Sequence, residues 1–593
     1  MSDLKDFFQR RVDGFAAEWA ATKKRINVVS ALRLVSILLI LPLIYFYATT
    51  ANSIWLILSF IMIVAFIALV TWHQNLFEKK VFLENIKVLN EEEINALQQK
   101  FEHFPSGQEF VKPSHNYAYD LDIFGDNSIF QYLNRTCTAS GKIRLSQILS
   151  TPLKDKNEIL ERQNMLQELD KKIDFRQEFQ ATGMSVSEDP KENQQLFKWF
   201  QEPPQFLNKG YLNILRFLLP AILFICIILA FFNTRFGSIA ILLSIFNLVF
   251  VGLFTGKINL IHSRISTKNG VLNKYLQLLK IIQKEKFQHP QLAQMQSTGQ
   301  ESMDAIQQFS KIVNRFDQRL NLLVGILLNM LILNDIQSVI AIERWKAKHQ
   351  TNIEQWLSVI FEIDALNSLA NFSFCHPHFI YPEINNDLKQ IDAYGIGHPL
   401  IPPDICILNN LSLGDKEKMI ILTGANMSGK STFLRTLGIN TVLALIGAPV
   451  YAEKFSTPIL EIMTSMRLTD SLKERASYFY AELKRLQSIV RSLESGTQLF
   501  IILDEILKGT NSEDKLSGSI ALIKRFTNYN CLGIIATHDL ELGKLEGQYP
   551  NKISNHCFES IIEEKKLSFD YTLKAGIAQN KNATFLMETM EII

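Results

Sequence analysis

The stretch "MIILTGANMSGKSTFLRTLG" (419–438) decides the fold of the C-terminal part of this chain. Its pattern Gly424-x4-Gly429-Lys430-Ser431 follows a short apolar run and precedes a helical pattern. A glycine-rich turn between a buried strand and a helix points backbone N–H groups inward, where they surround phosphate oxygens. The sequence therefore predicts a P-loop, the nucleotide-binding turn between a strand and a helix.

The residue types in this loop have distinct predicted roles. Lys430 neutralises the β- and γ-phosphates, and the Ser431 hydroxyl is a ligand for Mg²⁺. We therefore expect ATP and Mg²⁺ as the bound groups. The predicted nucleotide-binding residues are Gly424, Ala425, Asn426, Met427, Ser428, Gly429, Lys430, Ser431 and Thr432.

Two further apolar runs end in polar residues that complete such a site. The run "LFIILDEILKGTN" (499–511) places Asp504 at a strand end, where it suits Mg²⁺, and Glu505 beside it, where it orients the attacking water. The run "LGIIATHD" (532–539) ends in His538, which we expect to sense the γ-phosphate. The alternatives are a solvated acidic pair and a structural histidine. We predict Lys430, Glu505 and His538 as catalytic residues, with Ser431 and Asp504 at the metal.

The composition points to membrane segments. Hydrophobic residues make up 47% of the 593, and 41 residues are Phe. A membrane-spanning helix needs about 20 mostly apolar residues, and four stretches meet this requirement: 34–51, 54–72, 212–232 and 238–255. The short loops between them pair the stretches into two hairpins. The alternative is that they are buried core helices.

The basic residues predict the orientation of these hairpins. Basic residues flank the spans on one side: Lys5, Arg10, Arg11, Lys23, Lys24, Arg25 and Arg33 before the first, Lys79 and Lys80 after the second, and Lys257, Arg264 and Lys268 after the fourth. The hairpin tips carry only Arg235. Because basic loops remain in the cytoplasm, we expect a multi-pass protein of the inner (plasma) membrane. Its N-terminus and nucleotide-binding part would be cytoplasmic, without a cleaved signal peptide.

Two other apolar patterns receive different interpretations. Asparagine and aspartate interrupt the run at 320–336, which predicts a buried helix of a soluble domain. Residues 4–19 place apolar side chains on one helical face beside basic ones, as in a helix that lies on a membrane or packs against the soluble body. The six cysteines form no C-x-x-C pair, which argues against a disulfide framework or zinc site.

Several motifs occur in an order that is typical of one family. "HPLI" (398–401), "GANMSGKST" (424–432), "DEILKGTNSEDK" (504–515) and "THDLELGKL" (537–545) resemble the ATPase of the MutS mismatch-repair proteins, whose loop reads GPNMGGKST. The stretch that begins "NSIFQYLNRTCTASGKIRL" (127–145) resembles the helical core of that family.

The resemblance implies a homodimer with composite ATP sites. Ser477, in "DSLKERASYFY" (470–480), inherits the role of the serine that reaches the partner's nucleotide; capping its own helix is the alternative. Nothing before residue 127 resembles the mismatch-recognition domain. The resemblance therefore implies a membrane-anchored variant without that domain.

Basic residues outnumber acidic ones between residues 258 and 348, with twelve Lys and Arg against six Asp and Glu. The basic clusters are Lys280/Lys284/Lys286, Lys311/Arg315/Arg319 and Arg344/Lys346/Lys348. Non-specific DNA, anionic lipid or plain solvent are the alternatives for what they face.

We expect an α/β plus all-α protein: a doubly wound ABC-type P-loop ATPase domain, a MutS-like helical core and lever domain, and four transmembrane helices in two hairpins. The expected segments are 1–33 (amphipathic, basic), 34–72 (hairpin), 73–126 (connector), 127–205 (core), 206–257 (hairpin), 258–385 (lever) and 386–593 (ATPase).

The expected function is that of a membrane-anchored ATPase that couples ATP hydrolysis to binding of duplex or branched DNA, as in mismatch repair. The alternative is that DNA binding is lost and the lever motion acts on the membrane or on a membrane-protein partner. An ABC-type transporter fits less well, because the four spans precede and interrupt the lever region.

Overall fold

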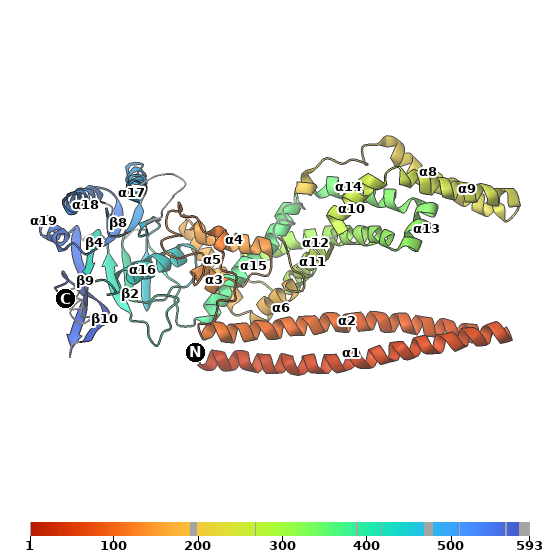
Figure 1. The fold of residues 1–593 in the computed structure, drawn as a ribbon, viewed down its shortest axis with the longest axis horizontal. Helices are drawn as coiled ribbons and strands as arrows, with labels where there is room; N and C mark the ends of the chain where they lie inside the picture. Colours follow the sequence, from red (N-terminus) through yellow and green to blue (C-terminus); the bar gives the residue numbers. More distant parts are fainter. Residues whose placement is uncertain are drawn as a thin grey trace. The chain divides into compact units, whose positions relative to one another are not determined.

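The computed structural model describes residues 2–189, 198–266, 269–386, 389–414, 417–467, 478–508, 510–563 and 566–579. It divides into two compact units (Figure 1). The helical unit consists of Met1–Ile94, Thr136–Lys142 and Lys172–Ala365. The α/β unit consists of Asn95–Arg135, Ile143–Lys171 and Leu366–Ile593. Residues 95–135 and 143–171, which the sequence analysis assigned to the connector and the helical core, thus group with the α/β unit.

The α/β unit is built on a six-stranded sheet. The strands are β4 (Met419–Gly424), β6 (Glu461–Ser465), β7 (Leu499–Asp504), β8 (Cys531–Thr537), β9 (Ile553–Glu563) and β10 (Lys566–Ala575), in the order β10-β9-β4-β8-β7-β6. Neighbouring strands are parallel, except that β10 is antiparallel to β9. The three apolar runs of the sequence form β4, β7 and β8. Because these strands are parallel, their carboxyl ends meet at one edge of the sheet.

Helices cover both faces of this sheet. On one face, α17 (Tyr478–Glu494) and α18 (Ser512–Phe526) contribute Ile489 and Phe526 to a buried cluster with Ile501 of β7. On the other face lies α16 (Lys430–Leu445), where Gly438 comes so close to Ile502 that an added Cβ would lie 3.0 Å from its side chain. Successive residues of β7 therefore face opposite helical layers, as expected for a strand that is buried on both sides.

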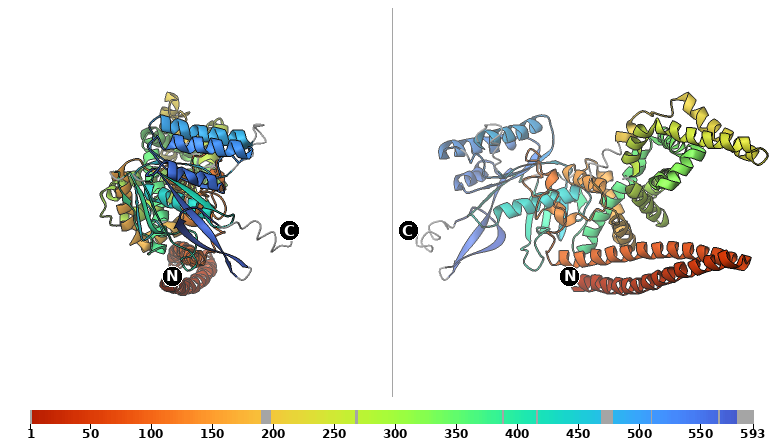
Figure 2. Two further views of the ribbon diagram at one scale, coloured as in Figure 1. Left: turned by 90° about the vertical axis from the view of Figure 1, so that its left-hand side faces the viewer. Right: turned by 45° about the vertical axis from the view of Figure 1, so that its right-hand side comes forward.

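The α/β unit also contains a smaller sheet and several short elements. The four-stranded sheet has the order β1-β5-β2-β3 and comprises β1 (Glu383–Ile384), β2 (Ile391–Ile396), β3 (Asn409–Leu413) and β5 (Lys454–Thr457). The short elements are η1 (Gln108–Phe110), α3 (Ile129–Leu133), the C-terminal part of α4 (Ala139–Ser150), α5 (Lys156–Asp170), η3 (Leu540–Lys544) and α19 (Leu545–Gln548). Figure 2 shows β9 and β10 as a hairpin that extends beyond the rest of the sheet.

In the helical unit, two long helices form an antiparallel hairpin. They are α1 (Ser2–Thr50) and α2 (Ser53–Leu97), and Ala51 between them has a left-handed backbone (φ 51°). Phe8 and Val12 are buried, and Arg11 forms an ion pair of 2.8 Å with Asp174. Since Asp174 belongs to α6 (Ile173–Gly183), the face at residues 4–19 packs against the helical unit. Of the two alternatives for this face, a helix on the membrane surface or a helix packed against the body of the protein, the structure shows the packed helix.

The second apolar hairpin consists of α8 (Gly210–Ala230) and α9 (Thr234–Gly252). By length and hydropathy, four described helices are suited to cross a membrane: α1, α2, α8 and α9. The bent pair of α13 (Leu322–Ile332) and α14 (Asn334–His349) meets the same criteria when taken together.

The prediction of a buried helix over 320–336 is wrong. The run forms α13, and Leu322 and Leu323 are 73% and 79% exposed. The polar residues that were taken as signs of a soluble core have local roles instead. Asn321 accepts a bond from the N–H of Val324 and caps the helix, and Asn329 accepts one from the N–H of Asp335 beyond its end. Composition alone does not distinguish a capping asparagine from one in a soluble core.

The helical unit has an aromatic core and several further helices. They are α10 (Thr255–Ser266), α11 (Asn269–Lys284), α12 (Pro290–Asp317), η2 (Gln318–Leu320) and the N-terminal part of α15 (Ile353–Cys375). The core contains Phe200, Phe309 and Trp345, with the rings of Phe309 and Trp345 4.3 Å apart. Aromatic side chains of this size dominate the apolar area that a core buries.

Candidate functional site

The loop between β4 and α16 has the backbone that its glycines predict. Gly424, Met427 and Gly429 have positive φ angles of 155°, 67° and 99°. A Cβ at Gly424 would lie 2.8 Å from the carbonyl oxygen of Phe558, so only glycine fits there. The loop leads directly into the N-terminus of α16, whose first backbone N–H groups have no partner within the helix. This arrangement is a cradle for an anion.

The side chain of Lys430 contacts the backbone of this loop. Its Nζ donates hydrogen bonds of 2.8 Å to the carbonyl oxygens of Gly424 and Ala425. Burial lowers the pKa of Lys430, and the nearby carboxylates of Asp504 and Glu505 oppose that shift. The ammonium group therefore lies at the centre of the cradle, where it complements a phosphate.

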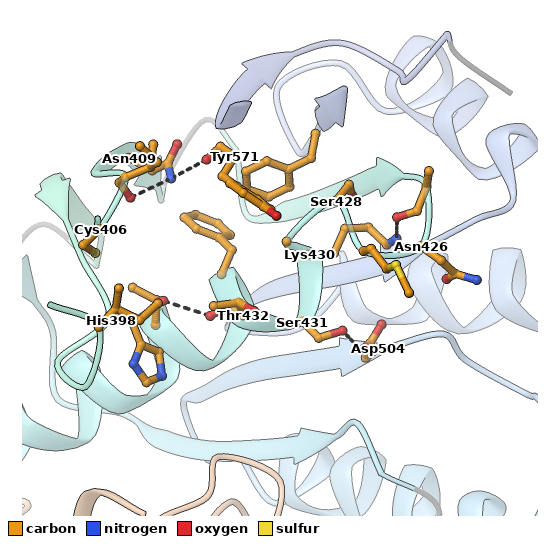
Figure 3. A pocket seen from close by; sticks show the side chains of 18 of the residues that line it. His398, Cys406, Asn409, Asn426, Ser428, Lys430, Ser431, Thr432, Asp504 and Tyr571 are labelled. Atoms are coloured by element: carbon orange, nitrogen blue, oxygen red, sulfur yellow. Dashed lines mark hydrogen bonds between the residues drawn. The ribbon is translucent and has the colours of Figure 1, made fainter. Parts of the chain in front are cut away.

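Ser431 and Asp504 meet at the edge of the sheet. The Ser431 Oγ donates a hydrogen bond of 2.6 Å to Oδ2 of Asp504, at the end of β7 (Figure 3). Within the described residues, no group of three or more His, Cys, Asp or Glu side chains is arranged to hold a metal. A hydroxyl and one carboxylate fit a site for Mg²⁺, which binds few protein ligands and takes the rest from water and phosphate.

Glu505 and His538 form a second pair at this edge. His538 Nε2 lies 2.8 Å from Oε1 of Glu505, and Lys508 Nζ lies 3.9 Å from Oε2. The hydrogen bond from His538 lowers the pKa of Glu505 to about 2. The carboxylate is therefore ionised at neutral pH and accepts hydrogen bonds. Its left-handed backbone (φ 53°) turns the chain out of the sheet directly after β7.

The turn after Glu505 is held by a residue that the sequence analysis missed. Glu482 of α17 is buried, and its carboxylate accepts bonds from the N–H groups of Leu507 (2.6 Å) and Lys508 (3.2 Å). Burial raises the pKa of Glu482. The sequence offered one indication of this role: Glu482 is an acidic residue on the apolar, inward face of an amphipathic helix.

A cavity of about 760 Å³ brings the predicted residues together. The predicted residues in its lining are Ala425, Asn426, Met427, Ser428, Gly429, Lys430, Ser431, Thr432, Asp504, Glu505 and His538. Gly424 lies beneath the loop as the acceptor for Lys430. Ser477 lies outside the described residues.

The far side of the cavity was not predicted. Its apolar wall includes Pro402, Ile405 and Ile407. Tyr571 of β10 closes the cavity, and Asn409 of β3 holds it in place (Figure 3): the Asn409 side chain donates to the carbonyl oxygen of Tyr571 (3.1 Å) and accepts from the N–H of Leu573 (2.7 Å). An apolar wall beside an anion cradle fits a ligand with a flat ring at one end and phosphate at the other.

Comparison with known families agrees with this geometry. The model of MutS domain V matches residues 420–591, and the model of MutS domain III matches residues 118–370. The chain belongs to the MutS family. The α8–α9 hairpin falls inside the domain III match.

Individual relatives match over shorter stretches. The DNA mismatch repair protein MutS of Thermotoga maritima is 29% identical over 234 residues, which are 39% of this chain and 29% of that protein. Its counterpart in Lachnoclostridium phytofermentans is 34% identical over 220 residues, 36% of this chain and 23% of that protein. MutS protein homolog 4 of Homo sapiens is 29% identical over 224 residues, 35% of this chain and 23% of that protein. In each case, the match spans less than a third of the relative's length.

Proposed function

We propose that this chain is a membrane-anchored ATPase of the MutS family. The observation that carries the proposal is the meeting of two pairs, Ser431 with Asp504 and Glu505 with His538, at the mouth of the loop that holds Lys430. Family membership supports ATP as the nucleotide, since the relatives include DNA mismatch repair proteins.

In the proposed reaction, Glu505 orients a water molecule toward the γ-phosphorus of ATP. The oxygen of the water forms a bond to phosphorus, and the bond from phosphorus to the bridging oxygen breaks. One proton of the water stays on the phosphate, the other passes to solvent, and ADP and phosphate leave. Bound Mg²⁺, held by Ser431 and Asp504, would supply charge that neutralises phosphate oxygens. Lys430 exchanges its carbonyl partners for phosphate oxygens, and His538 holds Glu505 in its ionised form.

The proposal includes a homodimer with composite sites. Ser477 would complete the partner's site, and ATP at one site would then change the affinity of the other. Met427 is an apolar residue that is 83% exposed in this loop, and its positive φ is uncommon for a residue other than glycine. A second subunit facing the loop would cover it.

Membrane placement of α1, α2, α8 and α9 rests on their length, their hydropathy and the basic residues that flank them. The test is extraction of cell membranes with alkaline carbonate. We expect the full chain to stay in the membrane pellet. Release into the supernatant would contradict the proposed localisation at the inner (plasma) membrane.

What the ATPase drives has two candidate answers. The names of the relatives favour DNA, bound without sequence specificity. The packing of two residues of the basic clusters favours the second answer, motion that acts on the membrane or on a membrane-protein partner. Lys346 is buried and donates to the carbonyl oxygen of Trp199, and Arg319 forms a largely buried ion pair with Asp335. These two basic residues are therefore not free to contact phosphates.

One experiment tests the ATPase and separates the two answers. ATP turnover of the full chain in nanodiscs is measured with and without homoduplex, mismatched and branched DNA, across a salt series. Lys430→Ala and Glu505→Gln are the negative controls. Turnover that both variants abolish supports the ATPase. Stimulation by DNA that weakens with salt supports the DNA answer, whereas no DNA binding at low salt leaves the membrane answer.

A further inference from the structure

The helix α13 carries an exposed apolar surface. Leu322, Leu323 and Leu327 are exposed, and no charged residue lies between Arg319 and Asp335. Large exposed apolar patches mark surfaces that another molecule or a membrane covers.

This surface is continuous with the α8–α9 hairpin. Leu331 packs against a buried cluster of Leu223, Cys226 and Ala240, which are contributed by both helices of the hairpin. The side-chain amide of Asn247, on α9, donates a hydrogen bond of 2.9 Å to the carbonyl oxygen of Met330. Figure 1 shows α13 beside the hairpin within the helical unit. Whatever surrounds the hairpin therefore also reaches α13.

The length of α13 and the bend after it exclude a full crossing by this helix. Its 11 residues extend about 16 Å at 1.5 Å per residue, roughly half of a hydrocarbon core of about 30 Å. At Leu333 the backbone is left-handed (φ 53°), and α14 leaves at 81° to α13. The chain thus runs along the hairpin over α13 and changes direction at Leu333.

Three backbone groups at this turn are bonded to side chains of the protein. Asn329 Oδ1 accepts from the N–H of Asp335 at 2.9 Å, and Gln337 Nε2 donates to the carbonyl oxygen of Ile332 at 2.7 Å. Together with the bond from Asn247 to Met330, these contacts satisfy backbone groups that the end of the helix leaves open. Non-helical backbone at membrane depth is tolerated only where protein or trapped water bonds it in this way.

An ion pair joins the two ends of the segment that contains α13. Arg319 Nε lies 3.0 Å from Oδ2 of Asp335, which joins the residues on either side of α13. Arg319 also donates to the side chain of Asn259, in α10, at 2.8 Å. The charged residues therefore meet outside the apolar element, and the apolar residues lie between them.

We propose that residues 320–333 form a re-entrant element whose exposed face is covered by the acyl chains of the bilayer. It enters the membrane beside α8 and α9 and returns through α14 on the same side. The inference rests on the proposed membrane placement of that hairpin.

The test is photo-crosslinking of the full chain in vesicles that contain an alkyne-tagged phospholipid. p-Benzoylphenylalanine replaces Leu323 on α13, Ile241 on α9 or Tyr394 on β2, all of which are exposed side chains. Ile241 is the positive control for lipid contact, and Tyr394 in the α/β unit is the negative control. ATP turnover verifies that each variant is folded.

Lipid attachment at Leu323 comparable to that at Ile241, with background attachment at Tyr394, is the expected result. Attachment at Ile241 but not at Leu323 would overturn the re-entrant element and leave the membrane anchor standing. Background attachment at both positions would overturn the anchor itself. A crosslink from Leu323 to a second protein chain in place of lipid would show that α13 is a subunit interface, and would also overturn the proposal.

Discussion

Glu482 accepts a hydrogen bond of 2.6 Å from the backbone N–H of Leu507, two residues after Glu505. The second carboxylate oxygen of Glu482 accepts from Lys508. A buried acceptor on α17 thus fixes the turn that aims Glu505 at the cavity. Glu482 does not line the cavity, so it acts as a positioning residue.

Glu482→Gln replaces one of these acceptors with an amide that donates. The loss of one bond to a charged group corresponds to about 1.5 kcal/mol, or roughly a tenfold decrease in kcat. We expect the KM for ATP to change little, because the loop that holds the phosphates is intact. Glu494→Gln, on the exposed end of the same helix, is the matched control. Equal losses in both variants would refute a role for Glu482 in positioning the turn.

Glu505→Gln removes the carboxylate that we propose orients the water. We expect ATP turnover to fall by about 10²- to 10⁴-fold, with ATP still bound. Steady-state turnover and equilibrium binding of a fluorescent ATP analogue measure the two quantities separately. Glu513→Gln, at the exposed start of α18, should behave as the wild type. Turnover within twofold of wild type in Glu505→Gln would mean that another group prepares the water.

His538→Ala should change the pH dependence of stability. In the folded chain the pKa of Glu505 is about 2, below its ordinary value of 4.5, chiefly because of His538. A lowered carboxyl pKa stabilises the folded state above pH 4.5, and this stabilisation is lost as the pH falls from 4.5 through 2.

The variant should therefore be less stable than the wild type at pH 7, by about 1 kcal/mol after solvent screening is allowed for. The difference should shrink as the pH falls below 4.5. Thermal unfolding in detergent at a series of pH values measures it. A difference that is constant from pH 7 to pH 3 would show that His538 stabilises the fold without acting on the Glu505 carboxylate.

Asp504→Asn should raise the Mg²⁺ concentration that supports half-maximal turnover. Loss of one negative charge beside Ser431 is expected to weaken metal binding by roughly 10- to 100-fold. A Mg²⁺ titration of turnover gives this value directly, and a chelator should abolish turnover in the wild type. Ser512→Ala, at an exposed position, serves as the control. An unchanged Mg²⁺ titration for Asp504→Asn would exclude Asp504 from the metal site.

The core of the site could be predicted because its residues follow strands that are buried. Asp504 is the last residue of β7, and His538 comes directly after the last residue of β8. Once both strands are identified, parallel pairing brings their ends to the loop after β4. Continuous apolar runs made that identification secure from the sequence.

Other parts of the site depend on contacts that a linear pattern does not contain. Asn409 and Tyr571 are separated by 162 residues and meet because β3 and β10 lie near each other. Glu482 reaches Leu507 across the face of the sheet. The sequence around Asn409 does not indicate Tyr571 as its partner, and the sequence around Glu482 does not indicate Leu507.

The error at 320–336 has a different origin. The asparagines lower the average hydropathy of the run in the same way whether they lie in a soluble core or cap a helix with an exposed apolar surface. Asn329 shows the difference only once the bend at Leu333 places it next to Asp335. Tertiary context, and not composition, decides such a segment.

Asn247 ties the α8–α9 hairpin to the helix α13, so this hairpin cannot be exchanged for another without affecting α13. Its amide donates to the carbonyl oxygen of Met330, so the α8–α9 hairpin supplies part of the fold of the chain that follows it. An unrelated apolar hairpin grafted in its place would leave Met330 and α13 without that support. A chain that exchanged this hairpin for another would have to retain an amide at the position of Asn247, or lose this support for α13.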